Sequence, residues 1–253
     1  MSVAGHRAGG DGAAPGGTAG DGSGGTAGDG LGAAPRPARL VGGLLGTAVA
    51  GVRRLRDRPL HPTGVVLSGT LHLEAPGAPG GAALGAPTVH DVVVRISRGG
   101  GLPEPWPDLF GLAVHWTDDG RPQDLLLSAT GLGRATRFLL APRRRPLAGA
   151  YGTLMPFRDL DGRPVMLAAV PAVAHCPSRE RTTGLQHLAD TELLLLSAHP
   201  AGRWRRLGLL RCGRALDTDA LRTDPVLHVP GALGTYAWAA ALRAPSYRAA
   251  RGG

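Results

Sequence analysis

The sequence predicts a mainly β fold with a few helices, of the α+β class, built on an antiparallel sheet. Its apolar runs are short, rich in Val and Leu, and separated by Gly, Pro and Asp. Asp118-Asp-Gly120 and Asp159-Leu-Asp-Gly162 carry the Asp-Gly signature of tight turns. This pattern favours a sheet closed into a barrel over a βαβ array, and a two-sheet sandwich fits it equally well.

Seven runs have the length and composition of strands. They are Gly64–Glu74, Asp91–Ser97, Phe110–Thr117, Gln123–Ser128, Pro164–His175, Leu185–His199 and Trp204–Gly213. We expect a helix at about Arg134–Leu140 between the two groups of strands, and a C-terminal helix at about Ala232–Ala250.

The N-terminal residues 1–37 are rich in Gly and Ala, and Gly-Gly-Thr-Ala-Gly-Asp-Gly occurs at 16–22 and again at 24–30. Such a segment has too few apolar side chains to offset the entropy of ordering the backbone, which predicts a disordered tail. Residues 38–253 are enough for one domain. Leu40–Val52 is apolar but too short to span a bilayer, so we expect a helix packed on the domain and no membrane span.

Composition argues against several classes of function. The formal net charge is +9, and every basic residue other than histidine is arginine. Aromatic residues make up only 4%, and no nucleic-acid recognition motif accompanies the arginines, so we expect no nucleic-acid partner. The two cysteines, Cys176 and Cys212, form neither a disulfide framework nor a zinc motif. With no signal-peptide pattern at the N-terminus, a cytoplasmic protein is the expectation.

Three short pieces of the chain fit one site: Arg58-Pro-Leu-His61, Arg95-Ile-Ser97 and Arg243-x-x-x-Tyr247. Residues two apart on a strand point to the same face, which groups Arg95 with Ser97. A spacing of four on a helix lets a guanidinium lie against a phenol, which groups Arg243 with Tyr247.

These pieces resemble the haem-site residues of the catalase family in its short, barrel-only form. Segments that follow in the family's order support the resemblance: Gly64-Val-Val-Leu-Ser-Gly-Thr70, Pro107-Asp-Leu-Phe-Gly-Leu-Ala-Val114 and Asp124-Leu-Leu. The likeness covers residues 50–130 well, is faint from 130 to 230 and returns at the C-terminus. It implies an eight-stranded antiparallel barrel with a C-terminal helix, so either one strand beyond the seven is still to be located or a long run bends and serves as two strands.

The resemblance also implies haem b as cofactor. Tyr247 would be the axial ligand of the iron, with Arg243 favouring the phenolate as an adjacent positive charge. Arg58 and Arg95 match positions that hold the haem propionates, and Arg98 is the alternative to Arg95. A guanidinium buried on a strand needs a partner in any reading, which applies to Arg95.

On the opposite haem face, the resemblance makes His61 the group that moves a proton between the two peroxide oxygens. Ser97 would accept a hydrogen bond from that imidazole and fix its tautomer. The alternatives are a strand-end histidine bonded to backbone and an ordinary barrel serine.

The sequence departs from the family at two positions. An ungapped alignment puts Ala129 where catalases have an asparagine over the iron, with Ser128 and Thr130 as possible substitutes, and Pro245 interrupts the helix that would carry Tyr247. The resemblance therefore implies a haem peroxidase with weak catalase activity, acting on hydrogen peroxide or organic hydroperoxides with a small-molecule electron donor. The alternative is a haem-free barrel that serves as a binding module or as a hydrolase of the kind labelled phosphodiesterase. A homo-oligomer is one alternative for the oligomeric state.

Overall fold

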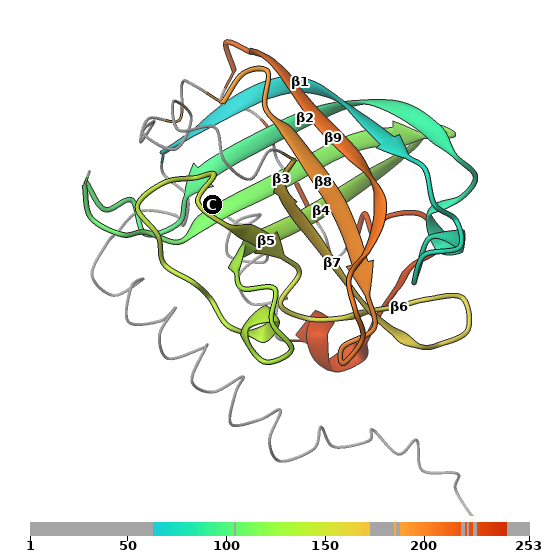
Figure 1. Ribbon diagram of the computed structural model, residues 1–253. Helices are drawn as coiled ribbons and strands as arrows, with labels where there is room; N and C mark the ends of the chain where they lie inside the picture. The colour runs from blue at the N-terminus through green and yellow to red at the C-terminus, as the bar shows by residue number, and fades with distance from the viewer. Residues whose placement is uncertain are drawn as a thin grey trace, which may run out of the picture. The chain divides into compact units, whose positions relative to one another are not determined.

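Eight antiparallel strands close on themselves in the computed structural model, which describes residues 63–103, 105–172, 185, 188–218, 221, 223–224 and 227–241. The strands of the barrel are β1 (Thr63–Leu73), β2 (Thr88–Arg98), β3 (Phe110–Asp118), β4 (Arg121–Thr130), β5 (Ala150–Gly152), β7 (Pro164–Pro171), β8 (Glu192–Ala198) and β9 (Arg205–Ala215). Each pairs with the next in that order, and β9 pairs with β1 to complete the circle. Figure 1 shows β8 and β9 completing the wall in front of β3 and β4. Closure leaves these strands without an exposed edge, so the barrel, and not the sandwich, is the fold.

Two very short strands lie outside the circle. β6 (Phe157–Arg158) pairs with the first residues of β7, and β10 (Gly234–Thr235) pairs with β6. Single 3-10 turns, η1 (Ala82–Leu84) and η2 (Thr136–Phe138), follow β1 and β4, and residues 237–241 form the described part of a short C-terminal helix.

All seven predicted strands are present, and the missing eighth is β5. It has only three residues, Ala150–Gly152, yet it bridges β4 and β7. Among the described residues of the run predicted at Leu185–His199, the strand is Glu192–Ala198. Asp119 and Gly120 have φ angles of +46° and +74°, which confirms a tight turn between β3 and β4.

The two predicted helices differ from expectation. In place of a helix over Arg134–Leu140 there is one turn of 3-10 helix, because Leu139 is extended and Leu140 pairs with Thr130. The C-terminal helix begins at 237 and not at 232, because the residues before it form β10. The predicted tail at 1–37 and the segment Leu40–Val52 lie outside the described residues.

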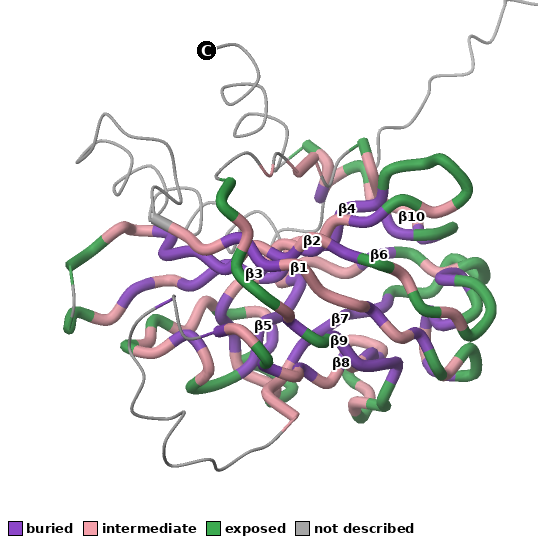
Figure 2. Tube along the Cα trace, turned by 90° about the horizontal axis from the view of Figure 1, so that it is seen from above, coloured by how far each residue is buried: buried purple, intermediate pink, exposed green. Residues whose placement is uncertain are grey.

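Side chains alternate along each strand between the barrel interior and its outer face. Interior positions are apolar and nearly all buried, for example Val92, Val94 and Ile96 on β2 and Leu125, Leu127 and Ala129 on β4. In Figure 2 the exposed segments gather in the turns and loops, and the strands alternate between buried and intermediate. The interior is thus filled by side chains, and polar groups that could act on a ligand belong to the outer face and the barrel ends.

Candidate functional site on the outer face of the barrel

A row of small residues crosses six neighbouring strands on the outer face. Strand register puts the following residues opposite one another in turn: Gly64, Ser97, Gly111, Ser128, Gly152 and Ala168. Each is flanked along its strand by residues that face the interior, so all six share the outer face. We call this set the outer-face row. Strands lie about 4.8 Å apart, so the row is a broad strip with almost no side chain standing above the backbone. Gly64 and Ser128 are half-buried, and the other four residues of the row are buried.

Arg95 and Ser97 both belong to this face, because the residues between and beside them, Val94 and Ile96, point into the core. Ser97 is buried and Arg95 is half-buried. A Cβ atom built on Gly64 would lie 3.1 Å from the Ser97 Cβ and 3.2 Å from the Arg95 Nε. Arg95 also has an interaction partner, as a half-buried guanidinium requires. Gly64 therefore lies beside the motif Arg95-Ile-Ser97, and its lack of a side chain leaves room for the arginine.

Ala129 lies on the wrong face to serve as the counterpart of an asparagine beside Ser97. It is 0% exposed, belongs to the interior cluster and is paired with the buried Tyr151. Ser128 is the β4 residue in the outer-face row, with Gly111 on one side and Gly152 on the other. The ungapped alignment therefore selects the wrong residue of β4. A shift of one residue on a strand reverses the face, and the outer-face residue is Ser128.

Arg98, the alternative to Arg95, is not on the outer face either. It is 5% exposed, stands over the Phe110 ring with its Cζ 5.2 Å from the ring centre, and lies 3.5 Å from the Asp108 carboxylate. The Asp108 carboxylate also accepts hydrogen bonds from the backbone N–H groups of Gly100, Leu102 and Leu109. These contacts close the end of the barrel and give Arg98 a structural role.

One described tyrosine, Tyr151, has an arginine against it, the arrangement expected for Tyr247. The Arg143 guanidinium carbon lies 4.2 Å from the Tyr151 ring centre, and the Tyr151 hydroxyl donates to the Pro146 carbonyl at 2.7 Å. Burial raises the pKa of Tyr151, which the nearby Arg143 only partly offsets. A fully buried hydroxyl that is already bonded to backbone is not available to a metal, so Tyr151 belongs to the core.

The structure also reveals a polar cluster that the sequence did not indicate. The Asp124 carboxylate is 0% exposed and accepts hydrogen bonds from His115 Nδ1 at 2.7 Å and from His228 Nδ1 at 2.8 Å. His115 lies opposite Asp124 on β3, whereas His228 is 104 residues away in sequence. The cluster occupies the outer face about 13 Å along the strands from Ser128, four residues at 3.3 Å each.

The four other predicted site residues, Arg58, His61, Arg243 and Tyr247, lie outside the described residues. Among the residues that are described, no three His, Cys, Asp or Glu side chains converge to hold a metal ion. Within the same part of the chain, no helix has the length and apolar character needed to cross a bilayer.

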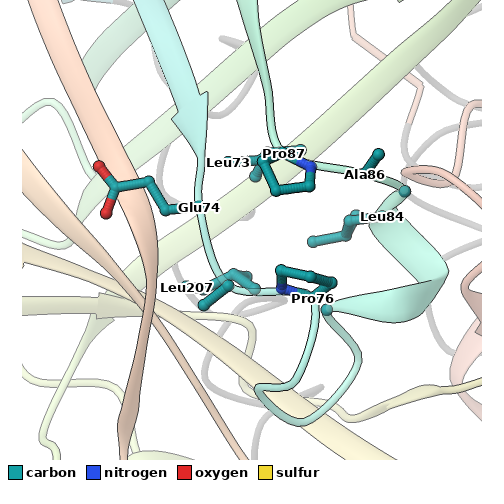
Figure 3. Close-up of a pocket in the computed structure, with 10 residues that line it drawn as sticks. Leu73, Glu74, Pro76, Leu84, Ala86, Pro87 and Leu207 are labelled. Atoms are coloured by element: carbon teal, nitrogen blue, oxygen red, sulfur yellow. The ribbon is translucent and has the colours of Figure 1, made fainter.

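A shallow apolar recess lies at the other end of β1. It is lined by the backbone and side chains around Leu73, Pro76, Leu84, Pro87 and Leu207 (Figure 3). Its carboxylate, Glu74, points away from the apolar lining in Figure 3 and is paired with Arg206 at 2.8 Å. The recess offers no reactive group, so it is not the candidate site.

Comparison with solved structures shows what the barrel is similar to. A bacterial catalase matches 90% of this chain with a TM-score of 0.54 and 14% identity, and a fungal catalase matches 80% with 0.54 and 11%. Catalase A from Saccharomyces cerevisiae matches 82% of the chain with a TM-score of 0.57 and 11% identity. The chain spans only 60–63% of the length of these three proteins. No protein-family model and no curated protein matches the sequence. The fold is therefore catalase-like, at a level of identity that supports the fold alone.

Proposed function

We propose that the protein is a haem-dependent peroxidase that reduces hydrogen peroxide or organic hydroperoxides and has weak catalase activity. The observation that carries the proposal is the position of Ser97 in the outer-face row of a catalase-like barrel, with Arg95 two residues away on the same face. A row of glycines, serines and alanine suits a flat ligand, because no large side chain would hold that ligand away from the backbone. Half-buried Arg95 at the border of the row suits one of its carboxylates.

The residues that would hold haem b come from three parts of the chain. Arg58 and Arg95 would bind the propionates, and Tyr247 would be the axial ligand with Arg243 stabilising its phenolate. When bound, ferric haem supplies the redox chemistry that cleaves the peroxide O–O bond. The chain supplies orientation, charge and proton transfer.

Proton transfer is the proposed task of His61. A neutral imidazole would take a proton from one peroxide oxygen and return it to the other, which would leave as water from hydrogen peroxide or as an alcohol from an organic hydroperoxide. Ser97 would accept a hydrogen bond from His61 and hold one tautomer. Two electrons from the small-molecule donor and two protons complete the conversion of one hydrogen peroxide to two waters.

Ser128 is the β4 residue in the outer-face row, so we expect it to meet a ligand there, and Thr130 follows two residues later on the same face. The Ser128 hydroxyl is shorter than the amide that catalases use, so it would hold peroxide less firmly during dismutation. A weak hold on hydrogen peroxide favours reaction with an added donor or with a bulkier hydroperoxide over oxygen evolution.

The test is a haem titration of the full-length protein with absorption spectroscopy. We expect a Soret band in the parent protein and its loss or a marked shift in Tyr247→Phe, whereas Tyr236→Phe serves as the matched control. Tyr236 lies just before the C-terminal helix and its hydroxyl is 3.4 Å from the Gly162 carbonyl, so its loss should leave the spectrum unchanged. Identical spectra in Tyr247→Phe and the parent would eliminate Tyr247 as ligand. No haem uptake by the parent, together with hydrolysis of an ester or phosphodiester, would establish the haem-free alternative.

A further inference from the structure

The segment that leads into the C-terminal helix is fastened across the barrel at several points. We call residues 224–236, as far as they are described, the C-terminal strap. Three of its N–H groups bond to two elements, β4 and η1. Asp224 N donates to Asp124 Oδ2, Gly231 N to Gln123 Oε1 and Ala232 N to the Ala83 carbonyl, each at 2.7 Å. Leu233 enters the interior cluster, and Gly234–Thr235 pairs with β6.

Asp124 is the polar centre of this attachment. Its Oδ2 accepts from both His228 Nδ1 and Asp224 N, and its own backbone N–H donates to the His228 carbonyl at 2.7 Å. Its Oδ1 accepts from His115 Nδ1, on the neighbouring strand β3. One side of the carboxylate therefore serves the strap and the other side serves the barrel wall.

Because the Asp124 carboxylate is buried, it needs hydrogen-bond donors from the protein. Asp124 is 0% exposed, and a charge removed from water is tolerated only where several donors replace its hydration. Two imidazole N–H groups and one backbone N–H do this, and hydrogen bonds to a charged acceptor are the stronger kind. Asp124 also selects the tautomer of both histidines, because each must carry its proton on Nδ1 to donate.

The strap leads directly into the C-terminal helix. The strap ends at β10, and the helix starts at 237, so the chain has no slack between its last fixed point and its first helical turn. Arg243 and Tyr247 follow the described helical residues by two and six positions. The strap is therefore the last attachment to the barrel among the described residues before Arg243 and Tyr247.

We propose that Asp124 is a positioning residue: through His228 it fixes the strap, and through the strap it sets the position of the C-terminal segment that carries Arg243 and Tyr247. This inference rests on the proposed function for its effect on haem, but the anchoring of the strap can be measured without haem.

The test compares two alanine variants that each remove one imidazole from the same carboxylate. His228→Ala removes the donor on the strap, and His115→Ala removes the donor on the barrel wall; the two side chains are similarly exposed, at 34% and 29%. In haem-free full-length protein we expect the Gly231 and Ala232 amides to exchange hydrogen about tenfold to a hundredfold faster in His228→Ala, the scale of one hydrogen bond to a charged group. In His115→Ala we expect a change of less than about threefold, because the strap keeps its own bonds.

The second readout is the spectrum of the haem-loaded protein. His228→Ala should shift the Soret band and the tyrosinate-to-iron charge-transfer band, and His115→Ala should leave both in place. Equal acceleration of exchange in the two variants, or none in either, would overturn the anchoring role. Faster exchange in His228→Ala with an unchanged spectrum would overturn the positioning role. A parent protein without a Soret band would refute the proposed function, and the exchange measurement would still decide whether Asp124 anchors the strap.

Asp124→Asn is the conservative variant that tests the charge itself. Asparagine keeps the size of the side chain and one acceptor oxygen but presents an NH2 group to one of the two imidazoles. We expect intermediate exchange rates at Gly231 and Ala232, between those of the parent and His228→Ala. Parent-like rates would show that the carboxylate charge has no part in holding the strap.

Discussion

Replacing Ala129 by asparagine tests which way β4 faces. A sequence alignment with catalases would predict that this change restores a catalytic amide beside the iron. The structure predicts that the new amide enters the barrel interior, where Ala129 is 0% exposed and its neighbours belong to the apolar cluster that includes Leu127 and Tyr151. The substitution should therefore lower stability and should not raise oxygen evolution.

The magnitude follows from two contributions. Burying an amide without a hydrogen-bond partner costs about 1–3 kcal/mol on the scale of protein mutational data. Forcing the extra atoms into a filled interior costs about 1–3 kcal/mol more. The sum, about 2–6 kcal/mol, corresponds to a fall in Tm of roughly 5–20 °C for a domain of this size.

The assay is urea unfolding followed by circular dichroism, with Ser128→Asn as the matched control. That variant adds the same amide one residue earlier, on the outer face, where the paired residues Gly111 and Gly152 have no side chains. We expect it to change the free energy of unfolding by less than about 1 kcal/mol. Equal unfolding midpoints for the two variants would show that the assigned register of β4 is wrong, because a slip of one residue exchanges the faces.

Three further predictions concern single side chains. The guanidinium of Arg137 stacks on Trp204 at 4.6 Å and donates to four carbonyls, those of Gly133, Leu132, His199 and Gly202. Arg137→Ala should therefore lower the free energy of unfolding by about 2–4 kcal/mol in the same urea assay. Arg137→Lys should recover less than half of this loss, because an ammonium group cannot reach four acceptors. Burial raises the pKa of the Cys212 thiol from 9.0 to about 12, so the unfolded chain loses this proton first and stability should fall as the pH rises above 9. The unfolding midpoint of Cys212→Ala should fall less over the same pH range. Equal slopes of midpoint against pH in the parent and the variant would contradict the burial of this thiol. If His61 moves the peroxide proton, His61→Ala should lower the peroxide-dependent rate by about a hundredfold or more while haem content stays nearly intact, and an unchanged rate would remove His61 from that role.

Most of the barrel could be predicted because its strands are long apolar runs and its hairpins carry their own turn residues. β5 could not, since three residues, Ala150–Gly152, have no periodicity to detect; the strand exists only because β4 and β7 supply partners on both sides. The helix predicted at Arg134–Leu140 has the right composition, but the pairing of Leu140 with Thr130 ends it after one turn. Tertiary pairing overrides local preference in both cases.

The candidate site, like the fold, could be predicted from the sequence only in part. That Arg95 and Ser97 share a face follows from strand alternation alone. The outer-face row needs the register of six strands, which no single segment encodes. The Asp124 cluster needs His228, which the chain brings back to β4 after 104 residues. Ala129 and Ser128 differ by one position, and only the observed burial of Ala129 distinguishes the two faces.

If haem lies against the outer-face row, a bulky side chain in the row should weaken its binding, and haem titration of Gly111→Leu alongside the parent measures this. Gly111 sits between Ser97 and Ser128, so a leucine there would stand in the middle of the row, while circular dichroism verifies that the barrel is retained. We predict a saturable Soret band with one haem per chain in the parent, and affinity at least about tenfold weaker in the variant, since a clash of one side chain costs on the order of 1–3 kcal/mol. Equal haem affinity in a folded Gly111→Leu protein, or no haem binding by the parent, would contradict the account.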